Sequence, residues 1–186
     1  MMSVSANLGD HLPFCLARPP IGGTNIQTVK NFDLNKYYGV WFEQVRSLSF
    51  ISYKSKCCTA EYHDLKNGTS SVQNACPSGE GIKAVGTPEN GDPARLSVDF
   101  DIPFKFAVPF AKGNYYVLYV EEGETQYELS VVGEPCRLLL WVLTREENPD
   151  PAKVQRALKV AQDQGFNTDK AVYRDSDCKA QREMSE

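Results

Sequence analysis

The sequence predicts an all-β protein: an eight-stranded antiparallel up-and-down β-barrel, one C-terminal α-helix and a short ninth strand. Two observations lead to this fold class, and one general rule of sheet closure completes the argument. From residue 39 onward, short runs rich in aromatic and β-branched residues alternate with turn signals. Between residues 148 and 165 the apolar residues recur at helical spacing, and a short strand-like run follows. Consecutive antiparallel strands can close on themselves, which leaves no exposed sheet edge.

Length and composition limit the classes of protein to consider. The 186 residues suffice for one domain with a sizeable core, and the net charge of -4 does not favour a nucleic-acid partner or a membrane surface. No apolar run approaches the roughly 20 residues of a membrane span. Residues 1–10 are too polar for the core of a signal peptide, so for a secreted protein we expect that the signal peptide has been removed from this sequence.

The chain divides into an arm, a domain and a tail. Residues 1–30 contain several prolines and glycines without an apolar period and are expected to form an irregular arm. The barrel domain with its helix is expected over residues 31–178, and residues 179–186 form a tail. The domain opens with a short helical turn, which Asn31 or Asp33 can cap, and Gly39 then lets the chain swing into the strand that contains Trp41.

The eight expected strands occupy residues 40–47, 57–65, 69–76, 82–87, 94–100, 114–121, 126–132 and 136–145. Residues 88–93 are expected to form a turn. The helix is expected to begin with Asn148 as its cap and Pro149 in its first turn, and to end at Gly165. The short ninth strand covers residues 171–173. These boundaries describe an up-and-down series of neighbouring strands with the helix added after the eighth.

Six cysteines, an even number, favour disulfides in an oxidising compartment, because no Cys-x-x-Cys pair or matching histidines suggest a metal site. The dipeptide Asn67-Gly68 predicts a two-residue hairpin turn. With that turn Cys58 lies beside Cys76, and a one-residue bulge would bring the two cysteines face to face. Asn67 also begins an Asn-Gly-Thr glycosylation sequon, although a good turn explains the Asn-Gly pair equally well.

The sequence offers little catalytic chemistry. His11 and His63 are its two histidines, and neither has the neighbours of a serine or metal site. Glycine-rich phosphate loops are absent from the sequence, and its Gly-x-Gly elements are turns. We therefore expect neither an enzyme nor a required cofactor or metal. The remaining class of function is a binding protein.

The run Asn31-Phe32-Asp33-Leu34-Asn35-Lys36-Tyr37-Tyr38-Gly39-Val40-Trp41-Phe42-Glu43 resembles the Gly-x-Trp signature of the lipocalin family, most closely its apolipoprotein D, bilin-binding, crustacyanin and bacterial members. The run from Gly133 to Arg145 resembles the family's eighth strand. The resemblance implies that Arg145 stacks on Trp41 at the closed base of the barrel, so that these residues and Gly39 are structural. It also implies the disulfides Cys57–Cys178 and Cys15–Cys136, with Cys58–Cys76 as an addition.

The resemblance further implies an open mouth and an inner ligand site. Alternation along the first strand places Trp41, Glu43 and Val45 on one face, which the resemblance makes the inside of the barrel. Burial of the Glu43 carboxylate there is costly unless it is paired or hydrated, so it can accept a hydrogen bond from a ligand. The loops at the mouth carry Phe50, Tyr53, Phe104, Phe106 and Phe110, either as a binding rim or as a plug over the barrel. Strand aromatics, of which about half should face inward, add Tyr62, Phe100 and Tyr116 to the candidate ligand contacts.

The expected function is that of a secreted, non-enzymatic carrier that encloses one small hydrophobic molecule, a bilin or carotenoid chromophore in the first instance. A fatty acid or sterol-like lipid is the next ligand class. Two alternatives from other classes are an isomerase with a free cysteine as nucleophile and an interaction module with a filled barrel. A count of free thiols separates the isomerase from the others, and a homo-oligomer is compatible with the carrier and with the interaction module.

Overall fold

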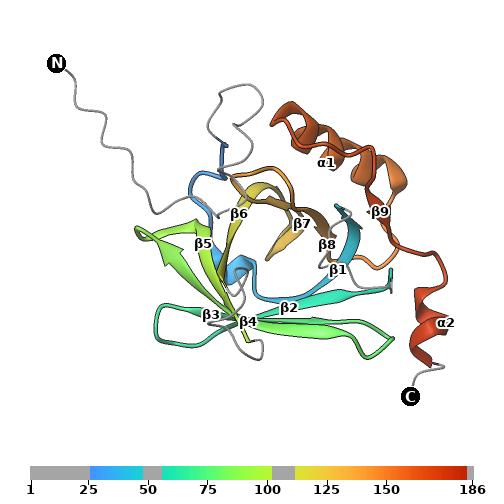
Figure 1. Cartoon of the computed structure of the whole chain (residues 1–186), viewed down its shortest axis with the longest axis horizontal. Coiled ribbons are helices and arrows are strands. Elements are labelled where there is room, and N and C mark those ends of the chain that lie inside the picture. Colours follow the sequence, from blue (N-terminus) through green and yellow to red (C-terminus); the bar gives the residue numbers. More distant parts are fainter. Residues whose placement is uncertain (1–25, 48–55, 102–111, 184–186) are drawn as a thin grey trace.

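The computed structural model describes residues 26–47, 56–101 and 112–183. Nine strands form one antiparallel sheet in the order β2-β3-β4-β5-β6-β7-β8-β1-β9, and a further pairing of β1 with β2 closes the sheet into a barrel (Figure 1). The strands are β1 (Gly39–Arg46), β2 (Thr59–Asp64), β3 (Ser70–Ala75), β4 (Gly81–Glu89), β5 (Asp92–Phe100), β6 (Lys112–Glu122), β7 (Tyr127–Gly133), β8 (Leu140–Thr144) and β9 (Val172–Tyr173). The predicted fold class is confirmed.

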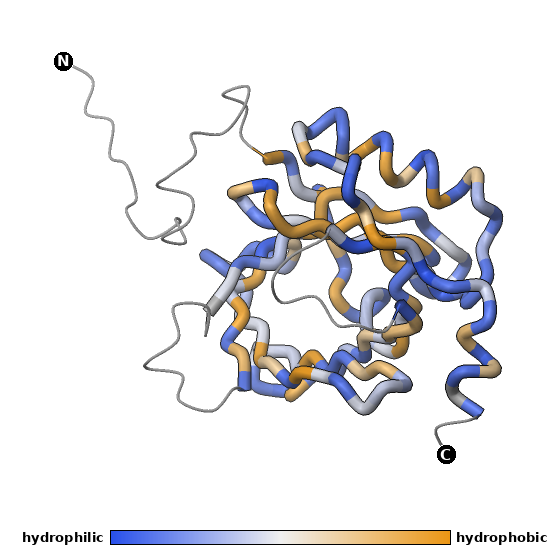
Figure 2. The backbone as a smooth tube through the Cα atoms, turned by 45° about the vertical axis from the view of Figure 1, so that its right-hand side comes forward, coloured by the Kyte–Doolittle hydropathy of each residue, from blue (hydrophilic) through white to orange (hydrophobic). Residues whose placement is uncertain are grey.

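Helix α1 (Pro151–Asp163) lies against the outer wall of the barrel formed by β6, β7 and β8. Its hydrophobic and hydrophilic residues alternate along the helix in Figure 2. The buried ones, Val154, Ala157, Leu158 and Ala161, pack on outward-facing residues of these strands. The predicted helix start was wrong: Asp150, not Asn148, caps the helix by accepting a hydrogen bond from the Ala152 amide, 2.9 Å away. Pro151, not Pro149, then occupies the first turn.

Strands β2 and β3 pair without the two-residue turn that the sequence predicted. Their register places Asp64 opposite Ser70, so residues 65–69 form the connection, with Lys66 and Gly68 at positive φ. This longer connection shifts the register by one residue relative to the two-residue turn. Cys58 and Cys76 therefore come face to face without a bulge, and they form a disulfide with a Cα–Cα distance of 4.2 Å.

Three further boundaries differ from the prediction. Pro88 and Asp92 belong to strands β4 and β5, so the expected turn over residues 88–93 shortens to Asn90 and Gly91, both at positive φ. Strand β8 begins at Leu140 rather than at Cys136. The preceding residues form a loop, held by the buried Glu134 carboxylate, which accepts hydrogen bonds from the amides of Cys136 and Leu139.

The expected tail contains a second helix, α2 (Cys178–Glu183), which the sequence analysis did not predict. Cys178, its first residue, forms a disulfide with Cys57 at a Cα–Cα distance of 5.2 Å. This bond joins α2 to the segment that leads into β2. Cys136 is also disulfide-bonded, whereas Cys15, its expected partner, lies outside the described residues.

Two bulges set which residues face the inside of the barrel. In β1 the register against β8 shifts between Glu43 and Val45, and in β6 the register against β7 shifts between Val117 and Tyr119. Each bulge adds one residue and reverses the alternation of the strand beyond it. Val45 consequently faces outward, where it belongs to the same cluster as the buried face of α1.

Candidate binding site

The closed base of the barrel is built around Trp41, whose side chain is fully buried. The short helix η2 (Leu34–Lys36) crosses this end, with Asp33 as its cap, and the Tyr37 carbonyl after it accepts a hydrogen bond from Trp41 Nε1 at 2.8 Å. The Arg145 guanidinium stacks on the indole ring, with Cζ 3.8 Å from the ring centre. Its N–H groups donate to several backbone carbonyls around the base, which include Tyr38 at 2.8 Å and Tyr127 at 3.2 Å. These contacts make both residues structural.

Above Trp41 a layer of aromatic rings forms the floor of the interior. The Tyr37 ring lies 4.8 Å from that of Trp41 and 5.2 Å from those of Phe32 and Tyr62, measured between ring centres. Phe32 in turn stacks on Tyr127 at 5.3 Å. Such offset and edge-on pairs add stabilisation beyond the area that they bury. The floor therefore consists of closely packed rings that fill the base of the barrel.

A chain of hydroxyl groups runs across this floor. Tyr62 and Tyr37 each lie 2.7 Å from the Tyr115 hydroxyl, measured between oxygen atoms, and Tyr37 donates to Ser130 at 3.1 Å. Burial raises the pKa of Tyr37 to about 12 and raises those of Tyr62 and Tyr115 well above their usual value. These tyrosines therefore stay neutral at physiological pH, and they present aromatic faces and hydroxyl groups to the interior.

The interior also holds an ion pair, formed by Glu43 and Arg46 of β1. They are 6% and 5% exposed, and Arg46 Nη1 donates to Glu43 Oε1. The bulge at Gln44 brings the two side chains to the same face, because Glu43 pairs with the inward-facing Leu143 and Arg46 with Trp141. Burial raises the pKa of Glu43, while the charge of Arg46 acts in the opposite direction.

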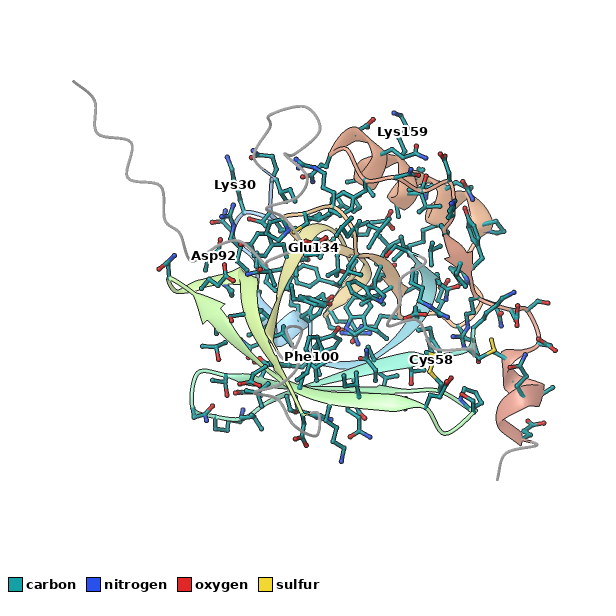
Figure 3. All side chains as sticks on the ribbon, viewed as in Figure 1. Lys30, Cys58, Asp92, Phe100, Glu134 and Lys159 are labelled. Carbon is teal, nitrogen blue, oxygen red and sulfur yellow. A yellow bond between two sulfur atoms is a disulfide. The ribbon has the colours of Figure 1, made fainter. Side chains whose placement is uncertain are left out.

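The inner wall becomes less buried away from the base. The register places four half-buried residues on the inner face, near the end that carries the β1–β2, β3–β4, β5–β6 and β7–β8 connections: Asn74, Ile82, Phe100 and Trp141. Figure 3 labels Phe100, the last residue of β5, and Cys58, which directly precedes β2. Trp41 and Tyr37 at the base are buried, so the burial of the inward-facing residues decreases from the base toward this end.

Three of the predicted contact residues lie on the inner face: Glu43, Tyr62 and Phe100. Two predictions of inward orientation were wrong. Val45 turns outward after the bulge at Gln44, and Tyr116 packs in the outer cluster, where its hydroxyl donates to Glu89 at 3.0 Å. The other five, Phe50, Tyr53, Phe104, Phe106 and Phe110, lie outside the described residues. Asn67 is exposed in the β2–β3 connection, and its glycosylation stays a prediction.

Sequence reasoning missed Arg46, Tyr37 and Tyr115 as inner residues. Tyr115 carried a usable signal, since in a strand either it or Tyr116 must face inward. Arg46 carried none, because its inward orientation depends on a bulge. Among the described residues, no cluster of histidine, cysteine or acidic side chains is arranged to hold a metal ion. Within the same ranges, no helix has the length and apolar character needed to cross a membrane.

An antiparallel barrel with a closed base, an aromatic floor and an outer helix is the architecture of a class of cup-shaped binding proteins. A family model described as a lipocalin-like domain matches residues 32–176. The chain therefore belongs to the lipocalin family, whose members are mostly non-enzymatic proteins that bind small hydrophobic molecules.

Curated relatives come from several kingdoms. The chain is 26% identical to temperature-induced lipocalin-1 of Arabidopsis thaliana, with 78% of this chain and 80% of the relative aligned. It is 29% identical to the outer membrane lipoprotein Blc of Vibrio cholerae, over 86% of this chain and 89% of that protein. Apolipoprotein D of Bos taurus is 34% identical, over 61% of this chain and 56% of that protein.

Solved structures support the same fold. Apocrustacyanin C2 superposes with a TM-score of 0.57 at 15% identity, over 78% of this chain and 82% of that chain. Lobster apocrustacyanin A1 gives a TM-score of 0.56 at 15% identity, over 77% and 81%. At this identity the likeness concerns the fold alone.

Proposed function

We propose that this protein is a secreted, non-enzymatic carrier of one small hydrophobic ligand held inside the barrel. The observation that carries the proposal is the gradient of burial along the inner wall, from the buried aromatic floor at Tyr37 and Trp41 to half-buried Phe100 and Trp141 near the opposite end of the barrel. Apolar walls with a few polar groups are typical of small-molecule sites. The disulfides Cys57–Cys178 and Cys58–Cys76 suit an oxidising, extracellular compartment.

A conjugated chromophore, a bilin or a carotenoid, is the first ligand class we propose, with fatty acids and sterol-like lipids as the second. Aromatic rings such as those of Tyr62, Phe100 and Trp141 can pack against a flat conjugated system. The structural likeness to crustacyanins concerns the fold alone and does not choose between these classes. The cysteines that the structure describes are all disulfide-bonded, which removes them as nucleophiles for an isomerase.

The test is an absorbance spectrum across the ultraviolet and visible range, combined with native mass spectrometry, on protein purified from its own source. A visible band together with an added mass of a few hundred daltons supports a pigment carrier. A colourless protein with an added lipid mass supports a lipid carrier. If the purified protein carries no added mass and takes up neither pigment nor lipid, the carrier function is refuted. That result favours an interaction module with a filled barrel, and the native mass spectrum also reports its oligomeric state.

A further inference from the structure

The ion pair of Glu43 and Arg46 inside the barrel is not explained by stability. Replacing a buried ion pair with apolar residues of similar size is often neutral or stabilising, because removing both charges from water costs more than their attraction returns. This pair faces the interior, beside the apolar side chains of Leu143 and Trp141, and it depends on an extra residue in β1. A charged pair placed there at a cost in stability is a candidate for ligand recognition.

We propose that the ligand carries a carboxylate, which replaces the Glu43 carboxylate on Arg46 when the ligand enters the barrel. This inference rests on the proposed carrier function and narrows its ligand class. A guanidinium binds a carboxylate through two parallel N–H donors, a geometry that a neutral hydroxyl or keto group does not match. Bilins and fatty acids carry carboxylates, whereas hydrocarbon carotenoids and most sterols do not.

The exchange has a defined proton balance. Before binding, Arg46 is positive and Glu43 negative; afterwards Arg46 pairs with the ligand, and Glu43 has lost its hydrogen-bonded partner. The other described groups that act on the Glu43 charge are Tyr62 on β2, which stays neutral, and Arg174 after β9. The Arg174 guanidinium lies 2.8 Å from Glu147 Oε1 and donates to the Cys58 carbonyl at 3.0 Å. Because these contacts fix its position, Arg174 does not replace Arg46 as the hydrogen-bonded partner of Glu43.

A buried carboxylate without a close positive partner favours its neutral form. Glu43 therefore takes up a proton from solvent as the ligand carboxylate binds, and its pKa, already raised by burial in the free protein, rises further. Because binding takes up a proton, the affinity for the carboxylate ligand weakens as pH rises through the interval between the two pKa values of Glu43. The slope of that dependence is at most about tenfold in Kd per pH unit for one proton.

The test compares matched ligands on the wild-type protein by isothermal titration calorimetry. The probes are a long-chain fatty acid with the alcohol of the same length, and a bilin with its dimethyl ester. We expect at least one acid to bind about tenfold or more tightly than its neutral partner. We also expect net proton uptake for that acid, measured as the difference in heat between two buffers of different ionisation enthalpy. These comparisons require no mutation.

Variants then assign the effect to the pair. Glu43→Gln removes the competing carboxylate and is expected to tighten acid binding and to abolish proton uptake. Arg46→Gln is expected to remove the preference for the acid while the neutral partner still binds. Glu122→Gln, which breaks the exposed Lys36–Glu122 pair on the outside with the same change in charge, is the control and should alter neither property. Near-ultraviolet circular dichroism of each variant shows that it is folded.

Equal binding of acid and neutral partner without proton uptake would overturn this proposal and leave the carrier function intact. A preference for the acid that persists in a folded Arg46→Gln variant would also overturn it, since another group would then hold the carboxylate. If none of the probes binds, the carboxylate proposal fails, and native mass spectrometry of protein from its own source then decides whether the carrier function fails with it.

Discussion

Replacing Arg145 with lysine measures how much one side chain contributes to closing the base. The guanidinium stacks on Trp41 with Cζ 3.8 Å from the ring centre and donates to the carbonyl oxygens of residues 36, 37, 38, 40 and 127. Lysine keeps the positive charge, but its ammonium group has neither the planar face for stacking nor the reach to several carbonyls at once. The substitution therefore separates geometry from charge.

The expected loss follows from these contacts. A hydrogen bond from a charged donor contributes about 1.5–3 kcal/mol, and a cation–π pair about 0.5–2 kcal/mol. Counting two hydrogen bonds lost without replacement and a weakened stacking contact, we expect Arg145→Lys to lower the free energy of unfolding by about 4 kcal/mol. For a domain of this size that corresponds to a fall in Tm of about 8–16 °C.

The assay is urea unfolding with the disulfides intact, followed by tryptophan fluorescence and far-ultraviolet circular dichroism. Arg95→Lys is the matched control, because Arg95 also lies over an aromatic ring, that of Tyr116, but at 5.2 Å and on the outer wall with an exposed guanidinium. It should cost less than about 1 kcal/mol. Equal losses for the two variants, or a loss below about 1 kcal/mol for Arg145→Lys, would refute the assignment of Arg145 as the closure of the base.

Two further predictions concern the disulfides and the buried tyrosines. The double variant Cys57→Ala/Cys178→Ala removes a disulfide that spans 121 residues, whereas Cys58→Ala/Cys76→Ala removes one that spans 18. The first variant should lower the free energy of unfolding by about 1–2 kcal/mol more than the second, because the longer loop gains more entropy in the unfolded state. Urea unfolding that gives the reverse order would contradict this loop-entropy argument. Burial raises the pKa of Tyr37 to about 12, so its neutral form stabilises the fold below the unfolded pKa of about 10 and that stability is lost as pH rises toward 12. The loss should reach about 3 kcal/mol and be reduced in Tyr37→Phe, as measured by unfolding at alkaline pH; an unchanged alkaline loss in that variant would assign it to other groups.

The barrel and its base were predictable because their signals are local and redundant. Period-2 runs separated by turns imply a series of antiparallel strands, and a glycine followed by a tryptophan marks the start of the first strand. Gly39 has φ +98° there, a conformation that a residue with a Cβ rarely adopts. Trp41 and Arg145 are far apart in sequence, and their contact was expected from the family resemblance rather than from spacing.

Ambiguous signals explain the boundary errors. The sequence offers two overlapping helix starts, Asn148-Pro149 and Asp150-Pro151, and both satisfy the rule of a capping oxygen followed by proline. Only the second is used as a cap, with the Asp150 carboxylate accepting from Ala152. The hairpin at Asn67-Gly68 shows the same difficulty, because a two-residue turn and the longer connection differ by one residue of register. The longer one places Cys76 opposite Cys58 without a bulge, whereas the two-residue turn would need one.

The inward-facing side chains of β1 could not be predicted, because a single extra residue in the strand determines which of them face the inside of the barrel. Without the bulge at Gln44, strict alternation along β1 would place Val45 inside and Arg46 outside, which leaves Glu43 buried and without its hydrogen-bonded partner. With the bulge, Val45 packs against the α1 cluster and Arg46 meets Glu43 inside the barrel. Gln44 itself is satisfied on the outer side, where its amide donates to Thr144 Oγ1 at 2.9 Å. One inserted residue thus supplies both a contact for the helix and the charged group that we propose recognises the ligand.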